Sequence, residues 1–125
     1  MRALIVKYDE IPAIEKSKGI RLKPIVVDKL AATIVTWDKG AEFGPEKHVD
    51  EQIDFILKGR MEWTIKDDLG DRKEILTEGM AIGLEPNVFH GGRALEDSMA
   101  VEIFCPADRH RELARQLGLI VSEAP

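Results

Sequence analysis

The chain has 125 residues, a length that fits one domain over residues 1–125 and that can bury a core without disulfides or a structural metal. Acidic side chains outnumber basic ones, 23 against 18, and no run of Lys or Arg forms a stripe. Phosphate binding relies on clustered positive charge, so the composition argues against nucleic acid as a partner.

The first half of the chain offers four strand candidates. Each is a short run of apolar or β-branched residues bounded by turn residues: residues 2–8, 19–27, 30–37 and 53–57. Pro24 confines the second candidate to a sheet edge or a bulge, because proline has no N–H to give to a strand ladder. Residues 12–18 are charged and show no clear period, so no element is assigned to them.

The second half continues in the same way. Residues 61–66 alternate apolar and polar side chains, which is typical of a half-buried strand, and residues 67–71 are expected to form a hairpin loop. Further strands are expected at residues 72–76, 80–85 and 99–105. Short strands with turn signals about every ten residues predict an all-β sandwich or barrel, and the strand count fits a double-sheet jelly roll.

The end of the chain is expected to be helical. Pro106 stops the last strand, and Asp108 can cap a short C-terminal helix over residues 109–117 that ends at Gly118. His110 lies among charged residues and is expected at the surface. Trp37 and Trp63 are expected in the core.

Residues 44–59 carry three side chains that can donate a lone pair to a metal: Glu46, His48 and Gln52. Glu46 and His48 have the same parity, so a bent strand or loop can aim all three donors at one point. Asp54 shares a strand face with Gln52 and is either a partner of the ligands or a further polar group of the pocket. On spacing alone, solvated loop residues are the commoner explanation. A second stretch, residues 79–92, adds His90 after a Pro-Asn turn.

The two stretches together resemble the paired motifs of the cupin superfamily. The first motif is matched by Glu46, His48, Gln52 and Gly59, with Glu46 where a histidine usually stands, and the second by Gly79, Pro86 and His90. The resemblance implies an all-β, cupin-type double-stranded jelly-roll barrel. It also implies that Glu46, His48, Gln52 and His90 hold one divalent transition metal ion. Such mixed nitrogen and oxygen donors suit Mn, Fe, Ni or Zn and do not choose among them; a metal-free pocket is the alternative.

A narrower resemblance, to the small pectin-degradation cupins, rests on residues 51–53, 86–90, 94–98 and 102–106. Members of that family linearise 4,5-unsaturated uronic acid monomers. The family has an Asp facing the pocket where this chain has Glu102, and a Phe two residues later, here Phe104. Its arginine after the proline is matched most nearly by Arg109, one residue late. Periodicity alone gives the opposite orientation, with Glu102 in water and Val101 in the core.

These observations lead to a functional hypothesis: a metal-dependent enzyme of sugar-acid metabolism that opens or tautomerises an unsaturated uronate or related sugar. Glu102 would move a proton, and Arg109 would grip the carboxylate of the small-molecule substrate. Phe104 and Asp54 are the expected substrate-binding residues. An exposed first-turn position is the alternative for Arg109. Two other functions stay open, a metal-dependent oxygenase and a non-catalytic small-ligand-binding or sensory cupin.

The cellular setting and the assembly are expectations as well. A lone cysteine, Cys105, suits a reducing compartment, and the apolar run at residues 3–6 is too short for a signal peptide or a membrane span. We therefore expect a cytoplasmic protein without a membrane partner. Ile53, Phe55 and Leu57 share the strand face opposite the proposed ligands, and cupins commonly pair through this sheet, so a homodimer is expected.

Overall fold

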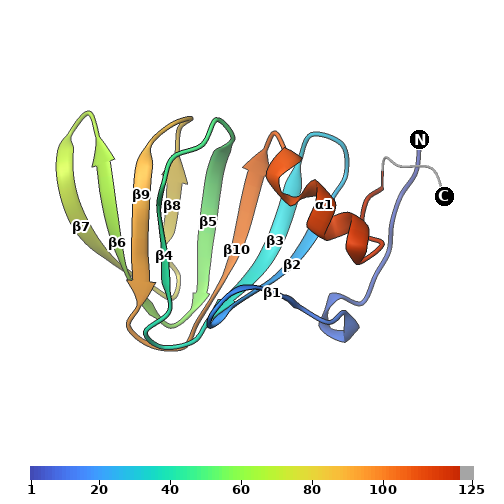
Figure 1. The fold of residues 1–125 in the computed structure, drawn as a ribbon, viewed down its shortest axis with the longest axis horizontal. Coiled ribbons are helices and arrows are strands. Elements are labelled where there is room, and N and C mark those ends of the chain that lie inside the picture. The colour runs from blue at the N-terminus through green and yellow to red at the C-terminus, as the bar shows by residue number, and fades with distance from the viewer. Residues whose placement is uncertain (122–125) are drawn as a thin grey trace.

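Residues 1–121 are described by the structure, a computed structural model in which strands form two antiparallel sheets (Figure 1). The larger sheet has six strands, in the spatial order β1 (Ile14–Ser17), β2 (Ile20–Val26), β3 (Ala31–Trp37), β10 (Ser98–Cys105), β5 (Glu51–Lys58) and β8 (Ala81–Leu84). The smaller has four, in the order β4 (Glu42–Glu46), β9 (Phe89–Ala94), β6 (Arg60–Asp67) and β7 (Gly70–Thr77). This arrangement confirms the all-β jelly-roll prediction.

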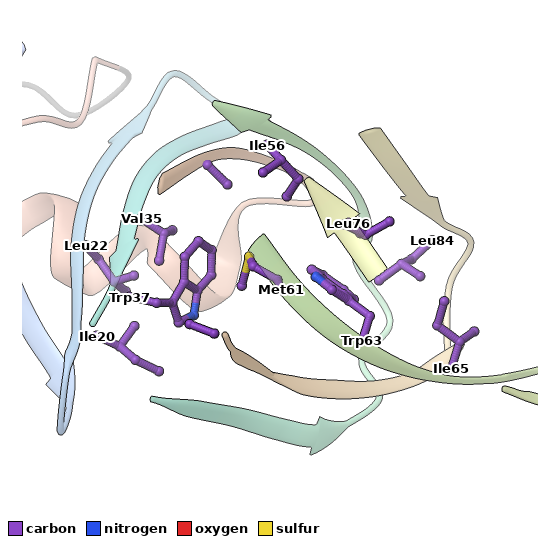
Figure 2. Close-up of a cluster of buried hydrophobic side chains, with 12 residues drawn as sticks. Ile20, Leu22, Val35, Trp37, Ile56, Met61, Trp63, Ile65, Leu76 and Leu84 are labelled. Carbon is purple, nitrogen blue, oxygen red and sulfur yellow. The ribbon is translucent and has the colours of Figure 1, made fainter. Parts of the chain in front are cut away.

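The core fills the space between the two sheets because alternate side chains of each strand point inward. Burial alternates strictly along β2, β3 and β5. Figure 2 shows the inward side chains meeting, with Trp37 near Val35 and Leu22, and Trp63 beside Met61 and Leu76. Trp63 is fully buried and Trp37 is 3% exposed. The prediction that both tryptophans belong to the core is therefore confirmed.

A second apolar cluster lies between one end of the larger sheet and the helix α1 (Asp108–Gln116), which Figure 1 shows beside β10, β3 and β2. It joins Phe104, Val26 and Ala114 among others. The helix begins one residue earlier than expected, with Ala107 at the N-cap position and no side-chain cap. The prediction that Asp108 caps the helix is wrong: Asp108 is its first helical residue, where a negative charge still suits the helix dipole.

Most expected strands are present, but the N-terminal part of the chain differs from the prediction. Residues 2–8 form no strand; the segment runs into a short 3-10 helix, η1 (Tyr8–Glu10), and Ile5 is 96% exposed. The apolar run there pairs with no neighbouring strand. The segment left unassigned contains β1, and Pro24 lies in the part of β2 beyond the residues that pair with β1. Proline there costs no ladder bond on the β1 side, as expected for an edge position.

Two strands of the smaller sheet, β4 and β9, were not predicted. The reason is visible in β9, whose Gly91 and Gly92 carry no side chain to show an alternating pattern. A Cβ on Gly92 would lie 2.2 Å from the backbone oxygen of Glu62, and one on Gly91 would lie 3.0 Å from Cα of Pro45. Glycine is needed there because β6 and β4 approach the backbone of β9 closely. Within residues 1–121 no helix has the length and apolar character needed to cross a membrane.

Candidate metal centre and cavity

A cavity of about 300 Å³ lies between the two sheets and collects side chains from both of them and from α1. The sequence-predicted residues on its wall are Glu46, Gln52, His90, Glu102, Phe104 and Arg109, whereas His48 and the fully buried Asp54 do not line it. Glu46 ends β4 and His90 sits opposite it on β9, while Gln52, Glu102 and Phe104 belong to β5 and β10. The fold thus brings together residues that are up to 63 positions apart in the chain, counting from Glu46 to Arg109.

The two histidines are held so that one nitrogen of each is left without a partner. Nδ1 of His48 lies 2.8 Å from the backbone oxygen of Asp50, and Nδ1 of His90 lies 2.9 Å from the backbone oxygen of Val88. A carbonyl oxygen can only accept, so in each neutral ring Nδ1 carries the hydrogen and Nε2 keeps its lone pair. Both Nε2 atoms are buried with no hydrogen-bond partner among the described residues. This is the tautomer that a metal-binding histidine adopts.

Glu46 adds a carboxylate to this pair. Its Oε1 is 3.6 Å from Nε2 of His90. Ligand atoms of Glu46, His48 and His90 all lie within 4.8 Å of one another, which is close enough for one ion to bridge them. The neighbouring His90 ring lowers the pKa of Glu46 to about 2, against the opposing effect of burial, with Lys16 and Arg109 as smaller favourable charges. Glu46 is therefore a carboxylate at neutral pH, the form that binds a cation.

Gln52 is oriented by two carboxyl groups. Its Nε2 donates to Oδ1 of Asp54 at 2.8 Å and, more weakly, to Oε2 of Glu102 at 3.4 Å. The amide oxygen Oε1 is then left buried and without a hydrogen bond in the part of the chain that the structure describes. Leaving a buried polar atom unpaired costs about 1–3 kcal/mol. Three such atoms, Nε2 of His48, Nε2 of His90 and Oε1 of Gln52, fit the donor set of a divalent metal ion.

Glu102 faces the cavity, as the resemblance implied and as periodicity alone did not. On β10 it alternates with Ala100 and Phe104, which are buried on the inner face. Its partner across the ladder on β5 is Asp54, which is fully buried. Burial, followed by the neighbouring Asp54 charge, raises the pKa of Glu102 well above its usual value, and burial also raises the pKa of Asp54. Glu102 is partly accessible because its carboxyl group lines the cavity.

Arg109, in the first turn of α1, is tied to a residue that sequence reasoning missed. Its Nε lies 3.0 and 2.9 Å from the two carboxylate oxygens of Asp50, and its guanidinium lies over the Phe104 ring at 4.9 Å. Asp50 is 2% exposed, and its Oδ1 is 3.2 Å from Nδ1 of His48. One carboxylate therefore links Arg109 to a candidate metal ligand. An acidic residue two positions after His48 was the signal that could have found it.

The prediction that His110 is a surface residue is wrong. It is 5% exposed, its Nδ1 is 2.7 Å from Oγ1 of Thr33, and its ring lies against Phe104. His110 faces the sheet because α1 packs against β2, and the bond to Thr33 joins it to β3. Burial first, and then the positive charges of Arg109 and Lys16, lower the pKa of His110 to about 4. It is a neutral member of the cavity wall.

The fold and the motifs together decide the family. The family model described as the cupin domain matches residues 33–106, which is more than half of the chain. The chain belongs to the cupin family. This cupin resembles the solved structure of KdgF from Halomonas sp. at 28% identity, over 83% of this chain and 94% of that one, with a TM-score of 0.73.

Two other solved structures share the fold of this cupin at lower identity. An RmlC-like cupin from Shewanella frigidimarina is 21% identical over 79% of this chain and 86% of that one, with a TM-score of 0.72. Ectoine synthase from P. lautus is 17% identical over 88% and 86%, with a TM-score of 0.73. At these identities the likeness concerns the fold alone. A comparison with curated proteins gives no match.

Proposed function

We propose that this cupin is a metal-dependent enzyme that acts on a small sugar acid, opening or tautomerising a 4,5-unsaturated uronate or a related sugar. One observation carries the proposal. His48 and His90, each with an unpaired Nε2, form a cluster with the Glu46 carboxylate, and two of the three, Glu46 and His90, line the same cavity as the carboxyl group of Glu102. The similarity to KdgF and to the pectin-degradation cupins supports the choice of substrate class.

The metal would be held by Glu46, His48, His90 and the amide oxygen of Gln52. Two nitrogens and two oxygens with one negative charge suit Mn, Fe, Ni or Zn. When bound, such an ion supplies Lewis acidity toward an oxygen of the substrate. The protein contributes the orientation of the donors: the backbone oxygens of Asp50 and Val88 fix the histidine tautomers, and Asp54 fixes the Gln52 amide.

Glu102 would transfer the proton. Oε2 accepts the weak hydrogen bond from Gln52, and the carboxyl group lines the cavity, where it would exchange a proton with the substrate. Its raised pKa keeps the carboxyl group protonated closer to neutral pH than an ordinary Glu, and a group poised in this way can donate to a leaving ring oxygen and later take a proton back. Asp54 disfavours ionisation of both carboxyl groups at once, its own and that of Glu102, because two negative charges on neighbouring strands repel.

Arg109 and Phe104 would position the substrate. Nε of Arg109 is already held by Asp50, so the carboxylate of a sugar acid would be met by the terminal nitrogens of the guanidinium. The Phe104 ring lies under that guanidinium and restricts it. The terminal nitrogens of Arg109 would therefore bind the substrate carboxylate. Its Nε is held by Asp50, which also contacts His48.

The proposal extends to assembly and to the cellular setting. Ile53, Phe55 and Leu57 point outward from β5 and are each nearly half exposed, and the neighbouring outward residues of β10 next to the first two are Ile103 and Val101. An apolar sheet face costs about 25 cal/mol per Å² left in water, so we infer that a second copy of the chain covers it as a homodimer. A reducing compartment such as the cytoplasm suits the lone Cys105.

The test begins with the metal. Protein purified without a His tag should contain a divalent transition metal by elemental analysis. His48→Ala and His90→Ala should each lower metal affinity by more than about 100-fold, which exceeds the loss caused by removing a residue that only hydrogen-bonds to a ligand. Glu46→Ala should lower it less, because water can replace a carboxylate oxygen. His110→Asn is the matched control, since His110 lines the same cavity outside the three-residue cluster. Unchanged metal in both His48→Ala and His90→Ala would remove the site.

The second part of the test is turnover. The metal-loaded protein should convert a 4,5-unsaturated galacturonate to its linear product, followed by NMR. Oxygen consumption with substrate would favour the oxygenase, and binding of the sugar acid without conversion would favour a non-catalytic ligand-binding cupin. Either result would overturn the proposed reaction while leaving the metal site in place.

A further inference from the structure

Strand β1 carries an irregularity that brings two consecutive side chains to the cavity. Glu15 pairs with Arg21 and Ser17 pairs with Ile20, so β1 advances two residues where β2 advances one and Lys16 is the extra residue. Consecutive side chains of a regular strand point to opposite faces, yet Lys16 and Ser17 both line the cavity. A bulge of this kind re-aims a side chain and is common beside active sites.

The Lys16 ammonium acts on several groups of the cavity without being paired to any of them. Its positive charge contributes to lowering the pKa of Glu46 on β4 and of His110 on α1, and it opposes the raised pKa of Glu102 on β10. Within residues 1–121 Lys16 makes no ion pair and no side-chain hydrogen bond. Arg109, the other cation on the cavity wall, is instead anchored by both oxygens of Asp50.

The two cations of the cavity therefore differ in what they can offer a ligand. The charge of Arg109 is largely compensated by the Asp50 carboxylate 2.9 Å away, whereas the charge of Lys16 is not compensated by an ion pair. An ammonium is a compact point charge on a flexible stem, and a charge-assisted hydrogen bond to a carboxylate is about twice as strong as a neutral one. An anionic group of a ligand in this cavity would gain most from Lys16.

We propose that Lys16 is a specificity-determining residue whose ammonium binds the carboxylate of the ligand, so that the cavity selects sugar acids over neutral sugars of the same shape. This inference rests on the proposed function, because it gives the carboxylate of that substrate class a second partner beside the terminal nitrogens of Arg109. It adds a residue outside both cupin motifs, contributed by an edge strand and placed by the bulge.

The experiment compares two probes that differ only in the group that Lys16 would bind. D-galacturonate carries a carboxylate where D-galactose carries a hydroxymethyl group, and neither has the double bond of the proposed substrate. Binding of both sugars to the metal-loaded protein is measured by NMR titration for the natural chain, Lys16→Met, Lys16→Arg and Lys18→Met. Lys18 is the matched control, since it lies two residues away and does not line this cavity.

The natural chain should bind galacturonate at least about tenfold more tightly than galactose, the size expected for a hydrogen bond to a charged group. Lys16→Met should weaken galacturonate binding about tenfold, leave galactose binding unchanged and flatten the dependence on salt. Lys16→Arg should keep part of the preference, and Lys18→Met all of it. An equal loss for both sugars, an undiminished preference in Lys16→Met, or no preference in the natural chain would each overturn the assignment.

Failure of the inference and failure of the proposed function are separable. If the natural chain prefers galacturonate through Lys16 but does not convert the unsaturated uronate, the reaction is wrong and the role of Lys16 stands. If it converts the unsaturated uronate and Lys16→Met leaves KM unchanged, the reaction stands and the role of Lys16 is wrong.

Discussion

Two adjacent rows of side chains on the inner face of the larger sheet differ sharply in chemistry. Both rows cross β3, β10 and β5 on the inward face, and along each strand they lie two residues apart. The first consists of Thr33, Glu102 and Asp54, and the second of Val35, Ala100 and Ile56. Thr33 and Asp54 are as deeply buried as the apolar row, and Glu102, half-buried between them, lines the cavity.

The comparison shows where this cupin buries polar groups at a cost in stability. Carboxyl groups are costly to bury, whereas the apolar row gains from burial like any core residue. Nothing in the strand geometry requires acids at the first row, since the second row shows that these strands accept apolar side chains there. Glu102, in the middle of the first row, lines the cavity between the buried Thr33 and Asp54, whereas the second row belongs to the core cluster and touches the cavity through Val35. The polar and the apolar row therefore meet between two neighbouring rungs of one ladder.

Glu102→Gln tests the polar row and should have the largest effect. The amide keeps the shape but cannot shuttle a proton, so turnover should fall by about two to four orders of magnitude. The free energy of unfolding at pH 7 should rise, because an ordinary Glu ionises in the unfolded chain while burial opposes ionisation in the folded one.

Kinetics, elemental analysis and urea denaturation check these outcomes together. Metal content should not change, since Glu102 is not a proposed ligand. Glu51→Gln, an exposed acid on β5, is the matched control and should leave all three quantities alone. Near-normal turnover in Glu102→Gln would assign the buried pair to structure rather than to catalysis.

Ile56→Ala tests the apolar row, two residues along β5 from Asp54. Ile56 is 2% exposed and packs in the main core, so its truncation should lower the free energy of unfolding by about 2–5 kcal/mol. Denaturant titration measures the loss. KM and metal affinity should stay close to those of the natural chain at temperatures where the variant is folded. A loss of metal without a loss of stability would contradict the separation of the two rows.

His110, which hydrogen-bonds to Thr33 of the polar row, gives the free energy of unfolding a pH dependence of its own. Its pKa is about 4 in the folded chain and 6.5 in an unfolded one, so the unfolded state takes up a proton first as the pH falls. Stability from this group is therefore complete above pH 6.5 and declines between pH 6.5 and 4, by about 3 kcal/mol in all.

The measurement is denaturation across that pH range with His110→Asn as the comparison. Asn keeps an amide group near the position of Nδ1, beside Thr33, but does not titrate in this range. Its stability curve should be flatter between pH 6.5 and 4. The pKa of Glu46 is 4.5 in an unfolded chain and about 2 in the folded one, so the loss from that carboxylate falls between pH 4.5 and 2, below most of the His110 window. Parallel curves for the two chains would show that His110 is not held neutral by burial.

Phe55→Ser tests the outer face of the same strand and should have the smallest effect on the isolated chain. Phe55 is 46% exposed, so the barrel interior should be unaffected and the unfolding of a single chain should change little. The expected change is in assembly: light scattering at micromolar concentration should show a dimer for the natural chain and a monomer for the variant. A monomeric natural chain would contradict the proposed interface.

The sequence revealed the residues that carry a motif and missed those that depend on packing. His48 and His90 could be found because their spacing to glycines and a proline is local. Alternation grouped the side chains of β5 by face, and the proposed ligand Gln52 identified which face points inward. Periodicity along β10 put Glu102 in water, because the face opposite it is wholly apolar whereas its own face also carries Ser98. Only the resemblance gave the right face.

The missed residues have a shared physical cause. Asp50 lies in a loop, Lys16 in a bulge and His110 on a helix that docks onto the sheet, and none of these placements follows from a local period. Each side chain is polar, so hydropathy assigns it to water. For Asp50 and His110 the hydrogen-bond partner is far away in the chain: Arg109 for Asp50 and Thr33 for His110.

The ring of Trp63 stacks on that of His90, with centroids 6.0 Å apart and 20° between the planes. This contact makes the indole an optical reporter of the metal centre. An ion with unpaired electrons, such as Mn(II), held by His90 would quench the emission of Trp63, while closed-shell Zn(II) would leave it largely intact. The cupin therefore carries a fluorescent probe beside its candidate metal ligand, and fluorescence titration of the unlabelled protein distinguishes these ions.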